Sequence, residues 1–339
     1  MELTGTVLAG SEYEPIEGRV VVEGGEIVAL EETKTESLDI IVPAFVNAHT
    51  HVGDSIAKEA GRGLSLDELV APPDGLKHRL LADASRESLV AAMRSSLQFM
   101  QRSGTAAFLD FREGGVDGVE MLRTAADGLD VEPFALGRDD PDVLDVADGY
   151  GASGARDADF SSERAAARTA GKPFAIHAGE RDPDDVDPAL DLDPAFVVHM
   201  VHAAERHLDR LAADDVPVVV CPRSNIVTGV GIPPVSKLLE RTTVALGTDN
   251  VMLNSPSMFR EMEFTAKLCD VSAPDVLRMA TAAGAELAGV NCGTIEPGRT
   301  ARLFVLDGAS ENLRNSRDPV RAVVRRAGVS DVKRVVLPR

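Results

Sequence analysis

Short apolar runs alternate with amphipathic segments from about residue 41 to residue 249, and no other feature of the sequence restricts the fold as strongly. The alternation is typical of parallel strands joined by crossover helices, because such strands are buried on both faces of the sheet. Eight runs can be counted, and they read IIVPAFVNA, GTAAFLDF, VEPFALG, DVLDVAD, KPFAIHA, AFVVHM, VPVVVC and TTVALGTD. They predict an α/β fold of the (β/α)8 (TIM) barrel type.

The segments between these runs have the periodicity of helices that bury one face. ASRESLVAAMRSSLQFMQRSG places four large apolar residues on one helical face, and a glycine follows as a C-cap. These residues are Leu89, Met93, Leu97, Met100 and Gly104. HAAERHLDRLAADD and SMFREMEFTAKLCD follow the same pattern, whereas DVLDVAD is the weakest of the eight predicted strands.

The two ends of the chain have a different texture. GRVVVEGGEIVALEE alternates around a Gly-Gly turn, and GTIEPGRTARLFVLDG resembles a second hairpin far downstream. Neither end is long enough to form a stable sheet alone. We therefore predict that residues 1–42 and 293–339 combine into a small β-domain, a β-sandwich, beside a barrel of residues 43–292.

The charge balance restricts the possible partners. Acidic residues outnumber basic ones 55 to 35, which gives a formal net charge of −20. A phosphate backbone would be repelled, so nucleic-acid binding is disfavoured. The acid is spread through segments such as RDPDDVDPALDLDP, which resembles adaptation to high salt in a halophilic archaeon; an ordinary acidic bacterial protein is the alternative.

Cysteine usage and the N-terminal segment favour a cytoplasmic protein. Cys221, Cys269 and Cys292 are odd in number and have no short paired spacing, which argues against a disulfide framework or a cysteine-based zinc site. MELTGTVLAGSEYEP has no basic leader before an apolar segment, and no stretch is long enough to span a bilayer. We expect no membrane partner.

Histidine is scarce, with seven in the chain, yet four histidines end predicted strands. His49 and His51 end the first run, and His177, His199 and Asp249 end the fifth, sixth and eighth. The carboxyl ends of barrel strands meet at one rim, and residues i and i+2 of a strand point to the same side. A lone H-x-H is more often a hydrogen-bonding pair, but the further strand-end residues predict a site for a metal with an open position for water.

These positions carry a resemblance to the amidohydrolase superfamily, and within it to the cytosine deaminase and chlorohydrolase-like branch. PAFVNAHTH, HAGE, VVHMVHAAERHL, CPRSN and LGTDN occur in that family's order and cover nearly the whole chain. The resemblance implies one divalent metal ion, with zinc as the default and iron or manganese as alternatives. The implied metal ligands are His49, His51, His177 and Asp249, and the implied catalytic residues are Glu180, His199 and Asp249.

The chain departs from the family pattern in two places. The fourth run lacks the lysine that bridges two metals in binuclear members, and Lys172 lies at the wrong end of the next run, which favours a mononuclear site. Val220 stands where many relatives have a histidine before Cys-Pro, a position outside the ligand set. His202 and His207 follow in the next helix, and we expect neither to bind metal, with His207 on the solvent side.

The resemblance also implies a mechanism. A single divalent ion makes a bound water acidic enough to supply hydroxide, which Asp249 orients. Glu180 transfers a proton to the ring nitrogen beside the attacked carbon, His199 stabilises the developing oxygen, and ammonia leaves. Four further residues at the rim are candidate substrate contacts, although charged residues at loop starts are more often surface groups. They are Arg112, Glu113, Arg138 and Asn225.

The leading hypothesis is a deaminase that acts on a small nucleobase-, nucleoside- or pterin-like molecule. A rival enzyme would cleave a cyclic amide or a carbon–halogen bond, and a non-catalytic barrel scaffold is a remote alternative. The zinc deaminases that carry C-x-x-C are excluded, because the chain has no such motif. Residues 52–82, which include His78, either cover the substrate or form part of the surface. A homo-oligomer is also possible, because relatives commonly self-associate.

Overall fold

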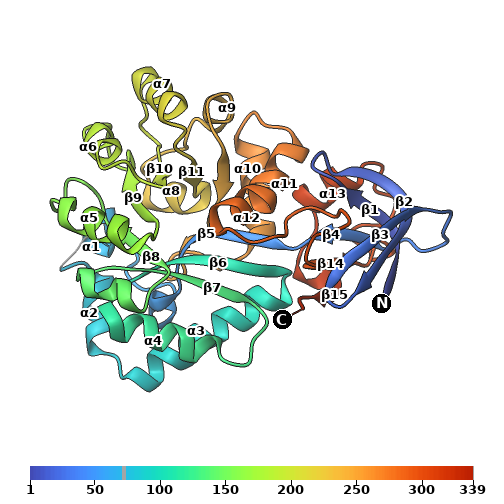
Figure 1. Ribbon diagram of the computed structural model, residues 1–339, viewed down its shortest axis with the longest axis horizontal. Coiled ribbons are helices and arrows are strands. Elements are labelled where there is room, and N and C mark those ends of the chain that lie inside the picture. Colours follow the sequence, from blue (N-terminus) through green and yellow to red (C-terminus); the bar gives the residue numbers. More distant parts are fainter. Residues whose placement is uncertain (71–73, 339) are drawn as a thin grey trace.

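The computed structural model describes residues 1–70 and 74–338. Two sheets organise the chain, and the larger is a curled parallel sheet of nine strands in the order β12-β11-β10-β9-β8-β7-β6-β5-β13 (Figure 1). Its strands are β5 (Phe45–His51), β6 (Thr105–Arg112), β7 (Glu132–Gly137), β8 (Gly149–Ala152), β9 (Phe174–Ala178), β10 (Phe196–His199), β11 (Val218–Val220), β12 (Val244–Leu246) and β13 (Asp249–Asn250). Their interiors are buried on both faces, as the continuous apolar runs indicate.

The sheet curls back onto its first strand. β12 pairs with β11 and β13 pairs with β5, although only Gly247 and Thr248 separate β12 from β13. A Cβ atom at Gly247 would lie 2.6 Å from Cβ of His49, so only glycine permits this approach. Thr248 N donates to Asn47 Oδ1 (3.0 Å), and Asn47 Nδ2 donates to Thr248 Oγ1 (2.7 Å). This arrangement is consistent with the predicted (β/α)8 barrel.

Helices connect the strands and cover the outside of the sheet (Figure 1). They are η1 (Val52–Ala57), α1 (Leu66–Val70), α2 (Leu76–Asp83), α3 (Arg86–Arg102), α4 (Gly115–Ala126), η2 (Pro141–Asp145), α5 (Ser161–Ala170), α6 (Val186–Asp191), α7 (Glu205–Asp214), α8 (Pro222–Thr228), α9 (Val235–Leu239), α10 (Met258–Leu268), α11 (Ala273–Ala280), α12 (Ala282–Ala288), α13 (Pro319–Arg325) and η3 (Val329–Asp331). The three helices predicted from periodicity are confirmed as α3, α7 and α10. The predicted apolar face of α3 is buried, but the expectation that His207 faces solvent is wrong, because its side chain is buried beneath α7.

The fourth strand lies later in the chain than predicted. Residues 142–148 were expected to form it, but this stretch begins inside η2, and the strand is β8. The Asp140 side chain accepts from Asp142 N (2.9 Å), which caps the helical turn. β8 contains two glycines, and a Cβ at Gly151 would lie 2.7 Å from the Phe111 ring. Close packing therefore requires small residues in this strand. For that reason β8 has too few apolar side chains to be recognised from the sequence.

The second sheet combines strands from both ends of the chain in the order β15-β14-β4-β1-β2-β3, and both termini lie beside it (Figure 1). Its strands are β1 (Glu2–Ala9), β2 (Glu14–Glu23), β3 (Glu26–Glu32), β4 (Ile40–Pro43), β14 (Leu303–Leu306) and β15 (Val332–Val336). The Gly-Gly hairpin is confirmed, whereas the expected second hairpin is wrong, because β14 pairs with β4 and β15. The β-sandwich form and the predicted domain boundaries stay predictions.

Cys221, Cys269 and Cys292 are free thiols, as their spacing indicates. Within residues 1–70 and 74–338, every helix is too short or too polar to cross a bilayer.

Candidate metal centre

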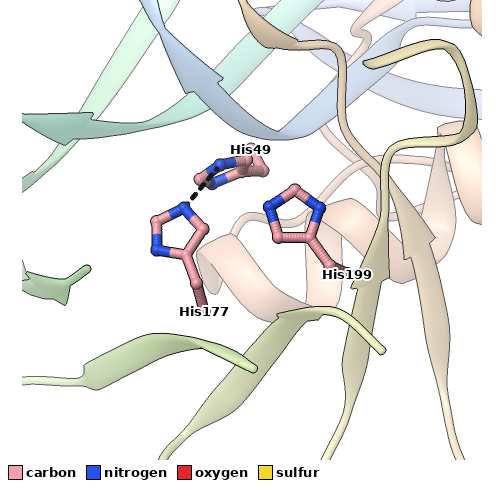
Figure 2. Close-up of side chains that lie close together, drawn as sticks. All are labelled: His49, His177 and His199. Carbon is pink, nitrogen blue, oxygen red and sulfur yellow. Dashed lines mark hydrogen bonds between the residues drawn. The ribbon is translucent and has the colours of Figure 1, made fainter. Parts of the chain in front are cut away.

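Five side chains from four strands converge at the carboxyl ends of β5, β9, β10 and β13. His49 Nε2 lies 3.3 Å from His177 Nε2 and 3.3 Å from Asp249 Oδ1. His51 Nε2 lies 3.6 Å from the same Asp249 oxygen. Figure 2 shows the rings of His49, His177 and His199 gathered around one small space. The structure thus brings together residues that are separated by as many as two hundred positions.

The distances and hydrogen bonds of these residues fit a shared metal ion. Two ligands that each bind zinc at about 2.0–2.1 Å with tetrahedral geometry lie about 3.4 Å apart, close to the separations observed. His177 Nδ1 donates to Ala152 O (2.8 Å), and His51 Nδ1 faces two acceptor oxygens at 3.0 Å, on Phe111 and Glu113. Both residues therefore keep the Nε2 lone pair free toward the shared space.

Burial keeps the imidazoles neutral, which is the form that binds metal. It lowers the pKa of His49, lowers that of His51 to about 3, and lowers that of His177 well below its ordinary value. Burial alone would raise the pKa of Asp249, but the hydrogen bond with His49 and the other nearby imidazoles hold it well below the usual range. The four groups together present three neutral donors and one carboxylate.

Asp249 and His199 are held in strained backbone conformations. Their φ angles are +57° and +84°, in a region that residues other than glycine seldom adopt. Ser224 Oγ donates to Asp249 Oδ2 (2.5 Å), and Asn250 Nδ2 donates to Asp249 Oδ1 (3.0 Å). Strained backbone conformations persist where the surrounding structure enforces them, and they cluster at functional sites. These two positions therefore indicate a functional site.

Glu180 faces His199 across the cavity. Its Oε2 lies 3.7 Å from His199 Nε2, and burial raises the pKa of Glu180. Asn225 Nδ2 lies 3.1 Å from His199 Nδ1. Because the amide can only donate through that nitrogen, His199 Nδ1 accepts and Nε2 carries the proton toward the cavity. Glu180 and His199 can thus exchange a proton with, and donate a hydrogen bond to, a bound molecule.

The four candidate substrate contacts lie at different depths. Arg138 lines the cavity, and its Nε donates to Gly151 O (3.0 Å). Arg112 and Glu113 are buried behind the cavity wall, where Arg112 Nε donates to Glu113 O (2.9 Å). Asn225 is buried behind His199.

The sequence reasoning missed Lys77, Ser224 and Asn250. Lys77 belongs to α2, within the segment after the first barrel strand, and it lines the cavity together with Leu66 and Val70 of α1. Periodicity cannot reveal such a lysine, because its role depends on how that segment folds back. Ser224 and Asn250 lie within the quoted motifs CPRSN and LGTDN, so their place beside other candidates was the available signal.

Outside the metal centre, the side chains of His78 and His207 have local partners. His78 Nε2 lies 3.1 Å from Val70 O and is not among the residues that line the cavity. Within the same 52–82 stretch, residues 71–73 lie outside the described residues. His207 Nδ1 accepts from Ala204 N (3.1 Å) at the start of α7, and His202 is partly exposed. That neither His202 nor His207 binds the metal stays a prediction.

Comparison with known proteins identifies relatives over nearly the whole chain. The model of the Amidohydrolase family matches residues 40–336. A putative aminohydrolase of Methanothermobacter thermautotrophicus is 35% identical over 95% of this chain and 93% of its own. The 5-methylthioadenosine/S-adenosylhomocysteine deaminase of Halobacterium salinarum is 28% identical over 99% of this chain and 90% of its own.

Solved structures of the same fold include two with bound zinc. An adenosine deaminase from Xanthomonas campestris has a TM-score of 0.80 and 20% identity, covering 98% of this chain and 90% of its own. The atrazine chlorohydrolase TrzN from Arthrobacter aurescens has a TM-score of 0.79 and 17% identity, covering 99% and 93%. At these identities the likeness establishes the fold.

Proposed function

The chain belongs to the amidohydrolase family, and on that premise we propose that it removes ammonia from a nucleobase-, nucleoside- or pterin-like small molecule. It is a metal-dependent deaminase, a hydrolase of carbon–nitrogen bonds other than peptide bonds. We take the curled sheet as a (β/α)8 barrel and the rim of its strands as the active site.

The convergence of three imidazoles and one carboxylate carries this proposal. Its ligand set for one divalent ion is His49, His51, His177 and Asp249, with zinc favoured by the donor atoms. A divalent ion in this place would lower the pKa of a coordinated water toward neutrality and so supply a nucleophile.

The residues around the ligands complete the reaction. Asp249, fixed by Ser224 and Asn250, orients the attacking water. Glu180 takes up one proton of the attacking water and delivers it to the ring nitrogen beside the attacked carbon. His199 donates a hydrogen bond through Nε2 to the oxygen that develops on that carbon. The second proton of the water passes to the amino group, so that the carbon–nitrogen bond breaks and ammonia leaves.

Metal analysis and a substrate panel test the proposal together. We expect about one equivalent of zinc, iron or manganese per chain, and ammonia release from at least one member of a panel of purines, nucleosides and pterins. Removal of the metal by a chelator should abolish the release, and added zinc should restore it. A metal-loaded protein that opens a lactam or removes a halogen but releases no ammonia would instead support the rival hydrolase. A folded protein with less than about half an equivalent of metal would support the scaffold.

A further inference from the structure

We propose that Lys77 is a positioning residue of the metal centre, which holds Glu113 and Asn250 in the orientations that fix His51 and Asp249. This inference rests on the proposed function, because it concerns the proposed metal ligands. It also assigns Glu113 to the support of a ligand, in place of the substrate contact expected from the sequence.

One ammonium group reaches two proposed ligands through one intermediate each. Lys77 Nζ lies 2.5 Å from Glu113 Oε1, and the same oxygen accepts from His51 Nδ1 at 3.0 Å. Lys77 Nζ also donates to Asn250 Oδ1 (3.2 Å), and Asn250 Nδ2 donates to Asp249 Oδ1 (3.0 Å). Lys77 is thus linked to the first and the last barrel strand at the rim where both ligands lie.

Lys77 is 3% exposed, and Glu113 is 6% exposed. Burying an ammonium group costs free energy unless it is paired and hydrogen-bonded. The fold is therefore stable only when Glu113 and Asn250 keep their oxygens turned toward Lys77. Lys77 belongs to α2 and lines the cavity, so these contacts join a helix of the long connection to the rim of the sheet.

Competing cations explain why Glu113 needs Lys77. Arg112 Nη2 lies 3.4 Å from Glu113 Oε2, and Arg138 Nη1 lies 3.8 Å from Glu113 Oε1. Without the ammonium, the carboxylate can turn toward these guanidinium groups and away from His51. Carboxylates that accept from a metal-bound imidazole orient its ring, and their loss typically costs 10–100-fold in metal affinity.

The link from Lys77 to Asp249 depends on which way the side-chain amide of Asn250 faces. The amide has one acceptor oxygen and one donor nitrogen. While Lys77 donates to its oxygen, its nitrogen must face Asp249. When the ammonium is absent, the Asn250 oxygen loses the donor that holds it, so the amide and its hydrogen bond to Asp249 are less firmly fixed. The links through Glu113 and through Asn250 therefore both predict weaker metal binding after loss of Lys77.

The test measures zinc affinity by competition with a chelator, without any substrate. We expect Lys77→Met to weaken zinc binding by about tenfold or more, within the range seen when outer partners of ligands are lost. Lys77→Arg, which keeps the charge but not the compact ammonium, should fold readily and weaken binding to a smaller extent. If Lys77 acts through Glu113, the double variant Lys77→Met/Glu113→Gln should lose less affinity than the product of the two single losses.

Lys172→Met is the matched control. Its ammonium is also partly buried, but it donates to Leu144 O and Ala147 O (2.7 Å for the latter) at the opposite ends of the strands. Its loss should lower stability and leave zinc affinity unchanged. A folded Lys77→Met protein with zinc affinity within twofold of the parent would overturn the inference and leave the proposed function intact. A parent protein that binds none of zinc, iron and manganese would overturn the proposed function itself.

Discussion

Glu180 is the residue whose protonation state the proposed reaction uses most directly. Its carboxylate is 3.7 Å from His199, and burial raises its pKa, so it can accept and return a proton closer to neutral pH than an exposed glutamate. We expect Glu180→Gln to lower kcat/KM for deamination by roughly 10²–10⁴-fold, because the amide keeps the shape and cannot carry the proton.

The same preparations should show that the metal is retained. Zinc content of Glu180→Gln should equal that of the parent, since Glu180 is outside the proposed ligand set. Glu205→Gln is the control, because Glu205 is exposed on α7 and pairs with Lys237 away from the cavity. A loss below about tenfold for Glu180→Gln would remove Glu180 from the proposed chemistry.

Among single residues, the sequence predicts those whose position follows from strand geometry. His49 and His51 alternate along one strand, and Asp249 ends the last one, so their convergence follows once the sheet is curled. Lys77 could not be found in this way, because its place depends on the path of a long connection. His207 was placed on the wrong side, because one residue of rotation on a short helix changes which face is buried.

Between elements, a buried ion pair joins α8 to α10. Arg223 Nε lies 2.6 Å from Glu261 Oε2, and the Arg223 backbone N–H donates to Glu261 Oε1 (3.0 Å). Loss of one member of a buried pair leaves the other charge uncompensated, at a cost of about 3–5 kcal/mol. We expect Arg223→Met to lower the free energy of unfolding by that amount in urea denaturation.

An exposed pair on the same helix is the control. Lys267 and Glu263 are one turn apart on α10 and both partly open to solvent. Lys267→Met should change the free energy of unfolding by about 0.5 kcal/mol or less. If both variants lose the same small amount, the Arg223 pair does not anchor α8, and another contact must hold Ser224 beside Asp249.

The elements that the sequence predicts well are those with a strong periodic signal. α3 is 17 residues long and buries one apolar stripe, so its pattern is clear. β8 has four residues, two of them glycine, and is hidden beside the more apolar residues of η2. β14 has four residues whose partners are distant in sequence, and local alternation cannot identify such partners.

Across the whole molecule, the excess of acidic over basic side chains determines how the free energy of unfolding changes with salt concentration. With 55 acidic and 35 basic residues, self-repulsion opposes the compact state. Exposed ion pairs act in the opposite direction, as where Asp193 contacts both Arg164 and Arg168, but each is worth only about 0–1 kcal/mol. Because the uncompensated charge is −20, we expect screening of repulsion to outweigh the loss of these pairs.

The melting temperature should therefore rise between about 0.1 and 1 M KCl near neutral pH, as the screening length falls from about 10 to 3 Å. Each kcal/mol gained corresponds to roughly 1–2 °C in a chain of 339 residues, because the entropy of unfolding grows with length. The effect should shrink near the sequence isoelectric point of about 4.7, where the net charge vanishes. A melting temperature that falls with KCl near neutral pH would mean that surface ion pairs dominate. The acidic composition would then be no adaptation to high salt.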